Sequence, residues 1–236
     1  MTIFALAYQA ELRDQQTGKH LERTSIYVRL LADRLAGLPQ YRGYLTPAYI
    51  SGLEKSAPLH DIGKVGVPDS ILLKPGKLTY EEMEQMKKHC EYGARILRRA
   101  EEKLGFRSFL SIAIQLAMHH HERWDGQGYP QGLAGERIPV SARIMALADV
   151  YDALSTTRPY KKAFSHQECL RIITEKRGTN FDPQVVDAFL ECEATFERTS
   201  RELSDESRPV EGSPVRSTRA LANPRKSRAI STAILP

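Results

Sequence analysis

One stretch of the chain, residues 140–154, reads VSARIMALADVYDAL. Its apolar side chains fall nearly all round a helical projection, so the stretch predicts a helix that is buried on most sides. One of its two carboxylates, Asp149, directly follows the apolar run IMALA. Because a carboxylate is rarely buried without a partner, Asp149 needs a cation or a hydrogen-bond donor in the core.

The segments on either side of this stretch also carry helical signals. Thr79 with Glu82, and Ser165 with Glu168, have the spacing of a capping box, in which hydroxyl and carboxylate satisfy each other's backbone N–H groups. No segment of useful length shows the apolar–polar alternation of a β-strand. The sequence therefore predicts an all-α fold.

Composition and cysteine usage exclude several classes of protein. The 236 residues are 41% hydrophobic and 27% charged, which suits a globular domain rather than a wholly disordered chain. No apolar run reaches the roughly 18 residues that a membrane span needs, and the N-terminus lacks the basic flank of a signal peptide. The three cysteines have no CxxC spacing, which argues against a cysteine zinc site and indicates a reducing compartment, the cytoplasm.

The net charge of +5 is concentrated near the C-terminus. Residues 199–236 carry seven Lys or Arg against four Asp or Glu, and they include no aromatic residue. Such a segment cannot bury enough apolar surface to offset the entropy of ordering. We therefore expect a folded domain over 11–198 and a disordered basic tail over 199–236. Because the folded part carries little net charge, we expect neither a DNA- nor an RNA-binding face, and no membrane contact.

Several histidines lie on the apolar faces of different predicted helices. His20, His89 and His120 each come from a separate helix, and His60-Asp61 directly follows Leu59. Burying these imidazoles with the carboxylates of Asp61 and Asp149 is costly unless something pairs with them. Divalent metal is the simplest partner, because neutral imidazole and carboxylate are good ligands for Fe, Mn and Zn.

Four blocks of the sequence resemble one known family, in that family's order. They are HDIGK at 60–64, HHERWDGQGYP at 120–130, ADVYDAL at 148–154 and RPYK at 158–161. Over about residues 11–192 the chain is similar to the HD-GYP domains, a branch of the HD superfamily of metal-dependent phosphohydrolases. The resemblance implies a helical bundle with a metal centre in its core, and hydrolysis of the second messenger cyclic di-GMP.

The resemblance also implies a centre of two or three metal ions. The expected metal ligands are His20, His60, Asp61, His89, His120, His121 and Asp149. Asp61 would bridge the two ions. Gln16 stands where three-metal members carry a glutamate, and because a neutral amide is a poor ligand for a hard cation we expect two ions rather than three. The ligand set favours Fe or Mn and leaves Zn and Ni open.

Charged residues beside the centre take their expected roles from the same resemblance. Asp61 and Lys64 are expected to be catalytic, with Lys64 contacting the scissile phosphate or protonating the leaving 3′-oxygen. Arg158 and Lys161 are expected to bind the substrate phosphates together with Lys64, since cations suit a dianionic ligand. Asp152 is expected to orient its neighbours rather than to bind metal.

The loop that contains Gly128, Tyr129 and Pro130 has two interpretations. In the family it is the proposed contact for diguanylate cyclase (GGDEF) domains, but a purely structural turn explains it equally well. Gly126 and Gly128 are expected to supply backbone angles that other residues avoid. A separate sensor or receiver protein is the other expected partner.

Three functions stay open at this stage. The first is a cyclic di-GMP phosphodiesterase that yields linear pGpG, with conversion to GMP left open. The second keeps the metal centre but acts on another nucleotide, including another cyclic dinucleotide. The third is a signalling adaptor that binds cyclic di-GMP or a cyclase domain with little catalysis.

Overall fold

The structure, a computed structural model, describes residues 2–13, 18–157 and 162–204 of the chain. Its helices are α1 (Thr2–Arg13), α2 (Gly18–Leu35), α3 (Pro47–Ser56), α4 (Asp69–Leu72), α5 (Tyr80–Lys87), α6 (His89–Leu104), α7 (Leu110–His119), α8 (Val140–Ser155), α9 (His166–Glu175) and α10 (Pro183–Glu202). Short 3₁₀ helices are η1 (Ala57–Leu59), η2 (Ile62–Gly66) and η3 (Gly135–Arg137). Extended pairing within these residues is limited to two isolated bridges, so the all-α prediction is confirmed.

The helix starts follow from local capping. Thr79 and Ser165 form the two predicted capping boxes, at α5 and α9, with both reciprocal hydrogen bonds present. The side chains of Thr46 and Asp182 cap α3 and α10, and each is followed by a proline at the first helical position. These four caps satisfy backbone N–H groups that would otherwise lack a partner.

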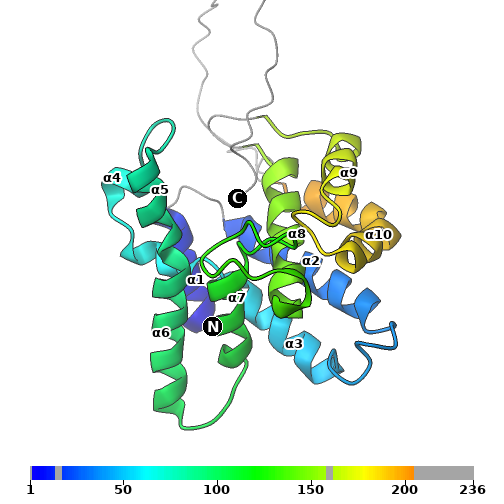
Figure 1. Cartoon of the computed structure of the whole chain (residues 1–236), viewed down its shortest axis with the longest axis horizontal. Coiled ribbons are helices and arrows are strands. Elements are labelled where there is room, and N and C mark those ends of the chain that lie inside the picture. The colour runs from blue at the N-terminus through cyan, green and yellow to red at the C-terminus, as the bar shows by residue number, and fades with distance from the viewer. Residues whose placement is uncertain (1, 14–17, 158–161, 205–236) are drawn as a thin grey trace, which may run out of the picture.

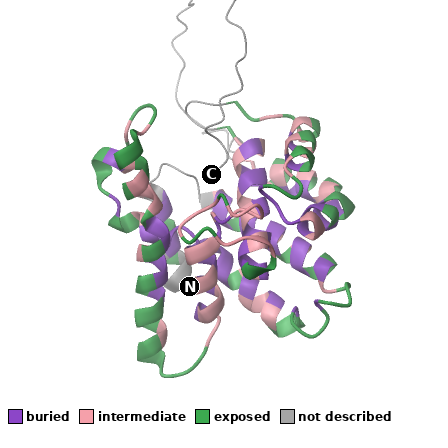
Figure 2. Ribbon diagram, in the orientation of Figure 1, coloured by how far each residue is buried: buried purple, intermediate pink, exposed green. Residues whose placement is uncertain are grey.

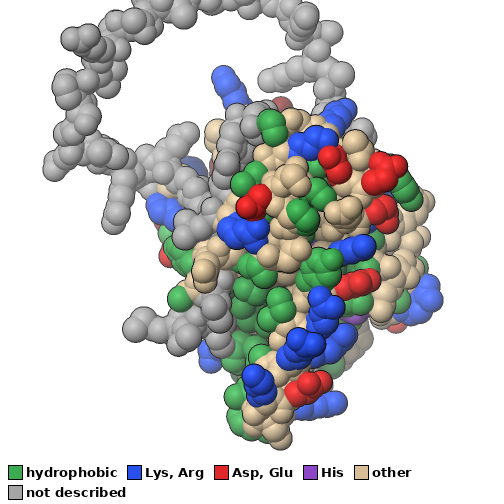
Figure 3. Space-filling model, turned by 90° about the vertical axis from the view of Figure 1, so that its left-hand side faces the viewer, with side chains coloured by type: hydrophobic (Ala, Val, Ile, Leu, Met, Phe, Trp, Pro, Cys, Tyr) green, Lys and Arg blue, Asp and Glu red, His purple; other side chains and the backbone are tan. Residues whose placement is uncertain are grey.

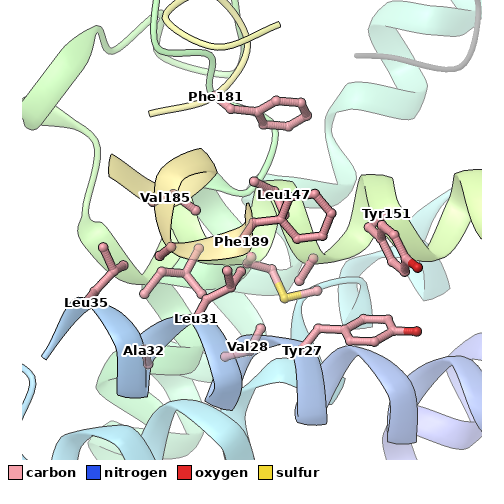
Figure 4. Close-up of a cluster of buried hydrophobic side chains, with 14 of the residues drawn as sticks. Tyr27, Val28, Leu31, Ala32, Leu35, Leu147, Tyr151, Phe181, Val185 and Phe189 are labelled. Carbon is pink, nitrogen blue, oxygen red and sulfur yellow. The ribbon is translucent and has the colours of Figure 1, made fainter. Parts of the chain in front are cut away.

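Helix α8 is the central element of the bundle (Figure 1) and packs against α2, α7, α9 and α10. Purple, buried ribbon dominates its length in Figure 2, as the apolar pattern of 140–154 predicts. Around it lies the larger core cluster, in which Tyr27 stacks on Phe196 and meets Tyr151 edge-on. Figure 4 shows Tyr27 and Tyr151 facing each other between α2 and α8.

A second, smaller core joins α1, α2, η1, η2, α6 and α7. Its buried members are Ala7, Ala10, Leu21, Leu59, Ile62, Leu97, Leu110, Ala113 and Ala117. Helix α1 contacts α2, η1 and η2. The sequence did not predict this helix, because its apolar start at residues 3–7 suggested no partner and the folded domain was placed from residue 11.

The C-terminal boundary of the folded part also differs from the prediction. Helix α10 continues to Glu202, and Thr199 is buried, so the boundary placed at 198 falls inside a helix. The cause is that Phe196 and Thr199 lie on the inner face of α10, near its end, and this anchors the last turn. The expected disorder of the rest of the tail, 205–236, lies outside the described residues.

The described surface mixes charged and apolar side chains. On the face in Figure 3, lysine, arginine, acidic and hydrophobic side chains lie among one another, and no single type covers the whole face. Tyr80 and Phe106 are the most exposed of the large apolar residues, at 76% and 66%. None of the described helices combines the length and the hydropathy that crossing a membrane requires.

Gly63 marks the close approach of η2 to the start of α6. A Cβ at this position would lie 1.9 Å from the carbonyl oxygen of His89 and 2.4 Å from the backbone nitrogen of Gly93. Both are backbone atoms, which cannot rotate away as a side chain can. The contact therefore requires glycine, and it holds the segment just after Asp61 against His89.

We predict that Gly63→Ala lowers the free energy of unfolding by about 3 kcal/mol or more, because η2 and α6 must separate. Urea unfolding followed by circular dichroism measures the change. The matched control is Gly43→Ala, since a Cβ there would meet no atom within 4 Å. The control should shift the free energy by less than about 0.5 kcal/mol. Equal effects of the two substitutions would contradict the packing argument.

Candidate metal centre

Five segments of the chain bring seven side chains together in the core. His20 comes from α2, His60-Asp61 from the turn between η1 and η2, and His89 from the first turn of α6. His120-His121 follow the end of α7, and Asp149 lies within α8. Ligand-type atoms form two close groups, namely Asp61, His89, His120 and His121, and His20, His60 and Asp149. These are the seven residues that the sequence predicted as ligands.

Four of the histidine rings are held by a hydrogen bond at Nδ1. The acceptors are Asp152 Oδ2 for His20 (2.7 Å), Ala57 O for His60 (2.8 Å), Met86 O for His89 (2.8 Å) and Leu116 O for His120 (2.9 Å). A carbonyl or carboxylate oxygen only accepts, so Nδ1 carries the proton in each ring. In the neutral rings, Nε2 is therefore a lone pair that points into the core.

These lone pairs have no hydrogen-bond donor to satisfy them. The Nε2 atoms of His20, His60 and His120, with Oδ1 of Asp61, are buried and lack a hydrogen-bond partner among the described residues. Asp61 Oδ1 lies 3.3 Å from His89 Nε2 and 3.6 Å from His120 Nε2. Buried acceptors that face one another are costly unless a proton or a cation lies between them. The donor set therefore fits divalent metal ions.

The two oxygens of Asp61 face different groups of ligands. Oδ1 faces His89 and His120, whereas Oδ2 lies 3.3 Å from His60 Nε2 and 2.7 Å from Lys64 Nζ. In the second group, Asp149 Oδ1 lies 3.9 Å from His20 Nε2 and 4.0 Å from His60 Nε2. Two ligands of one ion lie at most about 4.2 Å apart when each bond is about 2.1 Å. The four separations given for the two groups fall within this limit, so each group is close to the size of a site for one ion, and Asp61 lies between the two groups.

Charge and burial push the titrating groups of the centre in opposite directions. Burial alone would lower the pKa of His60, but the carboxylates of Asp61 and Asp149 outweigh it and raise the pKa to about 9. At His89 burial prevails and lowers the pKa to about 4. Burial would raise the pKa of Asp61, but the Lys64 ammonium and the His60 ring hold it well below its usual range. Asp61 is therefore a carboxylate at neutral pH.

Asp152 orients His20, as expected, and Arg23 supports it. Arg23 is buried and donates from Nε and Nη2 to the two oxygens of Asp152, at 2.5 Å and 3.0 Å. The sequence reading missed Arg23. Its signal is the spacing: Arg23 lies three residues after His20 and four before Tyr27, so a charged residue shares the buried face of α2.

Glu122 holds the loop that follows the paired histidines. Its buried carboxylate accepts hydrogen bonds from the backbone N–H groups of Gln131 (2.8 Å) and Leu133 (2.9 Å). Glu122 belongs to the 120–130 block of the sequence, but the sequence alone predicted no role for it. The carboxylate closes the loop back onto the end of α7, which places residues 128–130 beside the metal centre.

Tyr129 packs inward from this loop. Its ring stacks on His121, with centroids 4.7 Å apart, and Lys87 Nζ lies 5.3 Å from the ring centroid. Gly126 has the predicted positive φ of 80°, but Gly128 does not. Gly128 is required for another reason: a Cβ there would lie 2.3 Å from the backbone nitrogen of Arg123. The loop thus has a structural role, and its contact with a partner stays a prediction.

Some expected residues lie elsewhere or outside the description. His119, the residue before the pair, is in neither ligand group. Gln16, Arg158 and Lys161 lie outside the described residues. A further carboxylate that the sequence reading missed, Glu11 of α1, is buried with Oε1 4.0 Å from His20 Nε2. Its signal is a helical one, since it follows the buried Ala7 and Ala10 on one face of α1.

The chain is similar to known proteins over most of its length. The model of the HD domain family matches residues 10–185. The chain is 56% identical over 205 residues to a cyclic di-GMP phosphodiesterase of Vibrio cholerae. This match covers 87% of this chain and 42% of that protein. It is 40% identical over 189 residues to 3′3′-cGAMP-specific phosphodiesterase 2 of the same organism, covering 80% and 34%. The chain therefore spans less than half the length of these two relatives.

A solved structure shares the fold. The crystal structure of a cyclic GMP-AMP-specific phosphodiesterase of Vibrio cholerae matches with a TM-score of 0.59 at 20% identity. The match covers 87% of this chain and 50% of that chain. At this identity the likeness concerns the arrangement of the helices, and it agrees with the helical bundle that the sequence predicted.

The two ligand groups are expected to respond differently to pH. In the metal-free protein His60 carries a proton below about pH 9, and His89 stays neutral down to about pH 4. An ion in the His20 group must displace the His60 proton, so its affinity rises as the pH rises toward 9, by up to about tenfold per pH unit. The Asp61–His89 group should change little over that range. Elemental analysis after equilibration with limiting Mn²⁺ at about pH 6 and about pH 9 measures this. Parallel filling of both sites at the two pH values would contradict it.

Proposed function

The chain belongs to the HD domain family, and on that basis we propose that it is a metal-dependent phosphodiesterase that hydrolyses cyclic di-GMP to linear pGpG. The observation that carries this proposal is the buried centre itself, where the Nε2 lone pairs of His20, His60 and His120 converge with Asp61. The relative at 56% identity, which is named for this activity, supports the choice of substrate. Such an enzyme would lower the level of a second messenger.

Some residues of the centre would bind the metal ions, and others would contact the substrate. Two divalent ions, when bound, would polarise the phosphoryl oxygens, lower the pKa of the attacking water and stabilise the charge that develops. Asp61 is the residue common to both groups, because its two oxygens face different ligands. With imidazole and carboxylate ligands, Fe or Mn is the proposed metal.

Lys64 has a position suited to the leaving group. Its ammonium lies 2.7 Å from Asp61 Oδ2, and its side chain is only 14% exposed. A substrate phosphate bound to ions beside Asp61 would lie within reach of the Lys64 ammonium. We therefore assign Lys64 to the scissile phosphate or to protonation of the leaving 3′-oxygen. Arg158 and Lys161 are proposed phosphate contacts on the resemblance of RPYK alone.

A second cyclic dinucleotide is the strongest alternative substrate. The relative at 40% identity is named as specific for 3′3′-cGAMP. The metal centre acts on the phosphodiester, which both dinucleotides share, so discrimination must come from contacts with the bases. The adaptor hypothesis is less favoured, because the described structure keeps all seven expected ligands together.

Partners and location follow as further proposals. A cyclase domain or a sensor protein would contact the loop at 128–130, where Tyr129 is half-buried and Gln127 is exposed. The cysteines Cys90, Cys169 and Cys192 are buried and form no disulfide among the described residues. This agrees with the reducing compartment expected from the sequence, and we infer that the protein acts in the cytoplasm.

Two substitutions should separate ion binding from acid catalysis. Asp61→Asn removes the charge shared by both groups, so it should lose metal and hydrolysis together. Lys64→Gln should keep the metal content but lower kcat by about 100-fold or more, because the proton donor is gone. Elemental analysis and steady-state kinetics on the same samples measure both, with exposed Lys55→Gln as the matched control. A Lys64→Gln enzyme with normal kcat would refute its assigned role.

Substrate choice is tested with a panel of nucleotides. The Mn²⁺- or Fe²⁺-loaded protein should hydrolyse cyclic di-GMP faster than 3′3′-cGAMP at equal low concentration, with pGpG as the first product by chromatography. Protein stripped with a chelator provides the blank. A clear preference for 3′3′-cGAMP would transfer the proposal to that substrate. Tight binding of cyclic di-GMP without product would favour the adaptor.

A further inference from the structure

Glu11 is a buried acidic side chain with an oxygen that the described contacts leave unsatisfied. The side chain is 3% exposed, and its Oε2 is buried without a hydrogen-bond partner among the described residues. Its Oε1 lies 4.0 Å from His20 Nε2, which is also buried without a hydrogen-bond partner. When the His20 ring is neutral, two acceptors therefore face each other here, as they do around Asp61.

Arg13, on the same helix, makes its hydrogen bonds elsewhere and not with Glu11. Arg13 donates from Nη1 to the carbonyl oxygen of Val65 at 2.7 Å and from Nη2 to Asp69 at 2.6 Å. Its guanidinium is thus engaged with the end of η2 and the start of α4. A carboxylate in the core without a donor or a cation would be strongly unfavourable.

The distances around His20 are those of ligands that share one ion. His20 Nε2 lies 3.9 Å from Asp149 Oδ1 and 4.0 Å from Glu11 Oε1. Both separations fall below the limit of about 4.2 Å for two ligands of one ion. Glu11 itself lies outside the close group of His20, His60 and Asp149, so its side chain must turn toward the ion to join them. An ion beside His20 Nε2 would satisfy the ring and the carboxylates of two helices, α1 and α8.

We propose that Glu11 is a direct ligand of the cation held by His20, His60 and Asp149, which makes α1 part of the metal centre. This rests on the metal centre of the proposed function and extends it to a helix outside the motifs. The ion then has two imidazole and two carboxylate ligands, a set that suits Mn²⁺ or Fe²⁺.

Ligation by Glu11 couples metal loading to the docking of α1. The helix is attached at two points, through Glu11 to the ion and through Arg13 to the segment that follows Lys64. Binding of the ion should therefore slow the local opening of α1. This coupling gives a readout that does not depend on catalysis.

The test compares Glu11→Gln, which keeps the shape and removes the charge, with two controls. Glu22→Gln makes the same change at an exposed position of α2, and Arg13→Gln removes the other attachment of α1 while keeping the carboxylate. Each protein is equilibrated anaerobically at graded free Mn²⁺, and the bound Mn²⁺ per chain is measured. Hydrogen exchange of the α1 amides is followed with and without Mn²⁺.

We expect Glu11→Gln to weaken one Mn²⁺ site about tenfold or more and to leave the other unchanged. Slowing of α1 exchange by Mn²⁺ should disappear in this variant, while Glu22→Gln behaves like the wild type. Arg13→Gln should retain tighter Mn²⁺ binding than Glu11→Gln. Should Glu11→Gln fold poorly, Glu11→Asp, which keeps the charge but shortens the reach, should show the same selective weakening.

Two results would overturn the assignment. One is unchanged Mn²⁺ binding and unchanged α1 protection in Glu11→Gln. The other is an equal loss in Arg13→Gln, which would mean that docking of α1, rather than ligation, supports the site. Wild-type protein that loads Mn²⁺ through Glu11 yet hydrolyses no cyclic dinucleotide would refute the proposed function and leave Glu11 as a ligand.

Discussion

Each of four buried imidazole rings is fixed by one hydrogen bond at Nδ1, and this constraint governs the rest of the centre. When the rings are neutral, with the proton on Nδ1, the Nε2 lone pairs of His20, His60 and His120 point at one another and at Asp61. A core arranged in this way is unfavourable when empty and favourable around cations. The hydrogen bonds at Nδ1 therefore orient the rings for metal binding, and they are present in the fold without an ion.

Three of these bonds are local, which explains how short motifs can carry the chemistry. His60 and His89 bond to the carbonyl three residues earlier, and His120 bonds to the carbonyl four residues earlier. Such carbonyls lie where a helical turn ends, and each has a second lone pair to offer. A histidine placed just at a helix junction therefore orients itself. His20 is the exception, because its orientation comes from Asp152 on α8 and, through it, from Arg23.

Sequence reasoning succeeded where the signal was local or belonged to a motif. The capping boxes at Thr79 and Ser165, the buried helix around Asp149 and the HD domain family are all confirmed. It failed where a partner was distant in sequence: nothing in residues 3–13 shows that α1 reaches His20, and nothing near Thr199 shows that α10 continues. Gly128 was chosen correctly for the wrong reason, since a close backbone approach, rather than a positive φ, excludes a side chain there. The ligand roles themselves remain predictions, because geometry shows convergence but not occupancy.

The central claim is that the converging lone pairs hold two ions, one on each side of Asp61. Anomalous X-ray diffraction from crystals of the protein loaded with Mn²⁺, recorded on both sides of the Mn absorption edge, tests it most directly. The account predicts two peaks, one among Asp61, His89, His120 and His121 and the other among His20, His60 and Asp149. Peaks only at the protein surface, or a core without any anomalous signal, would contradict it.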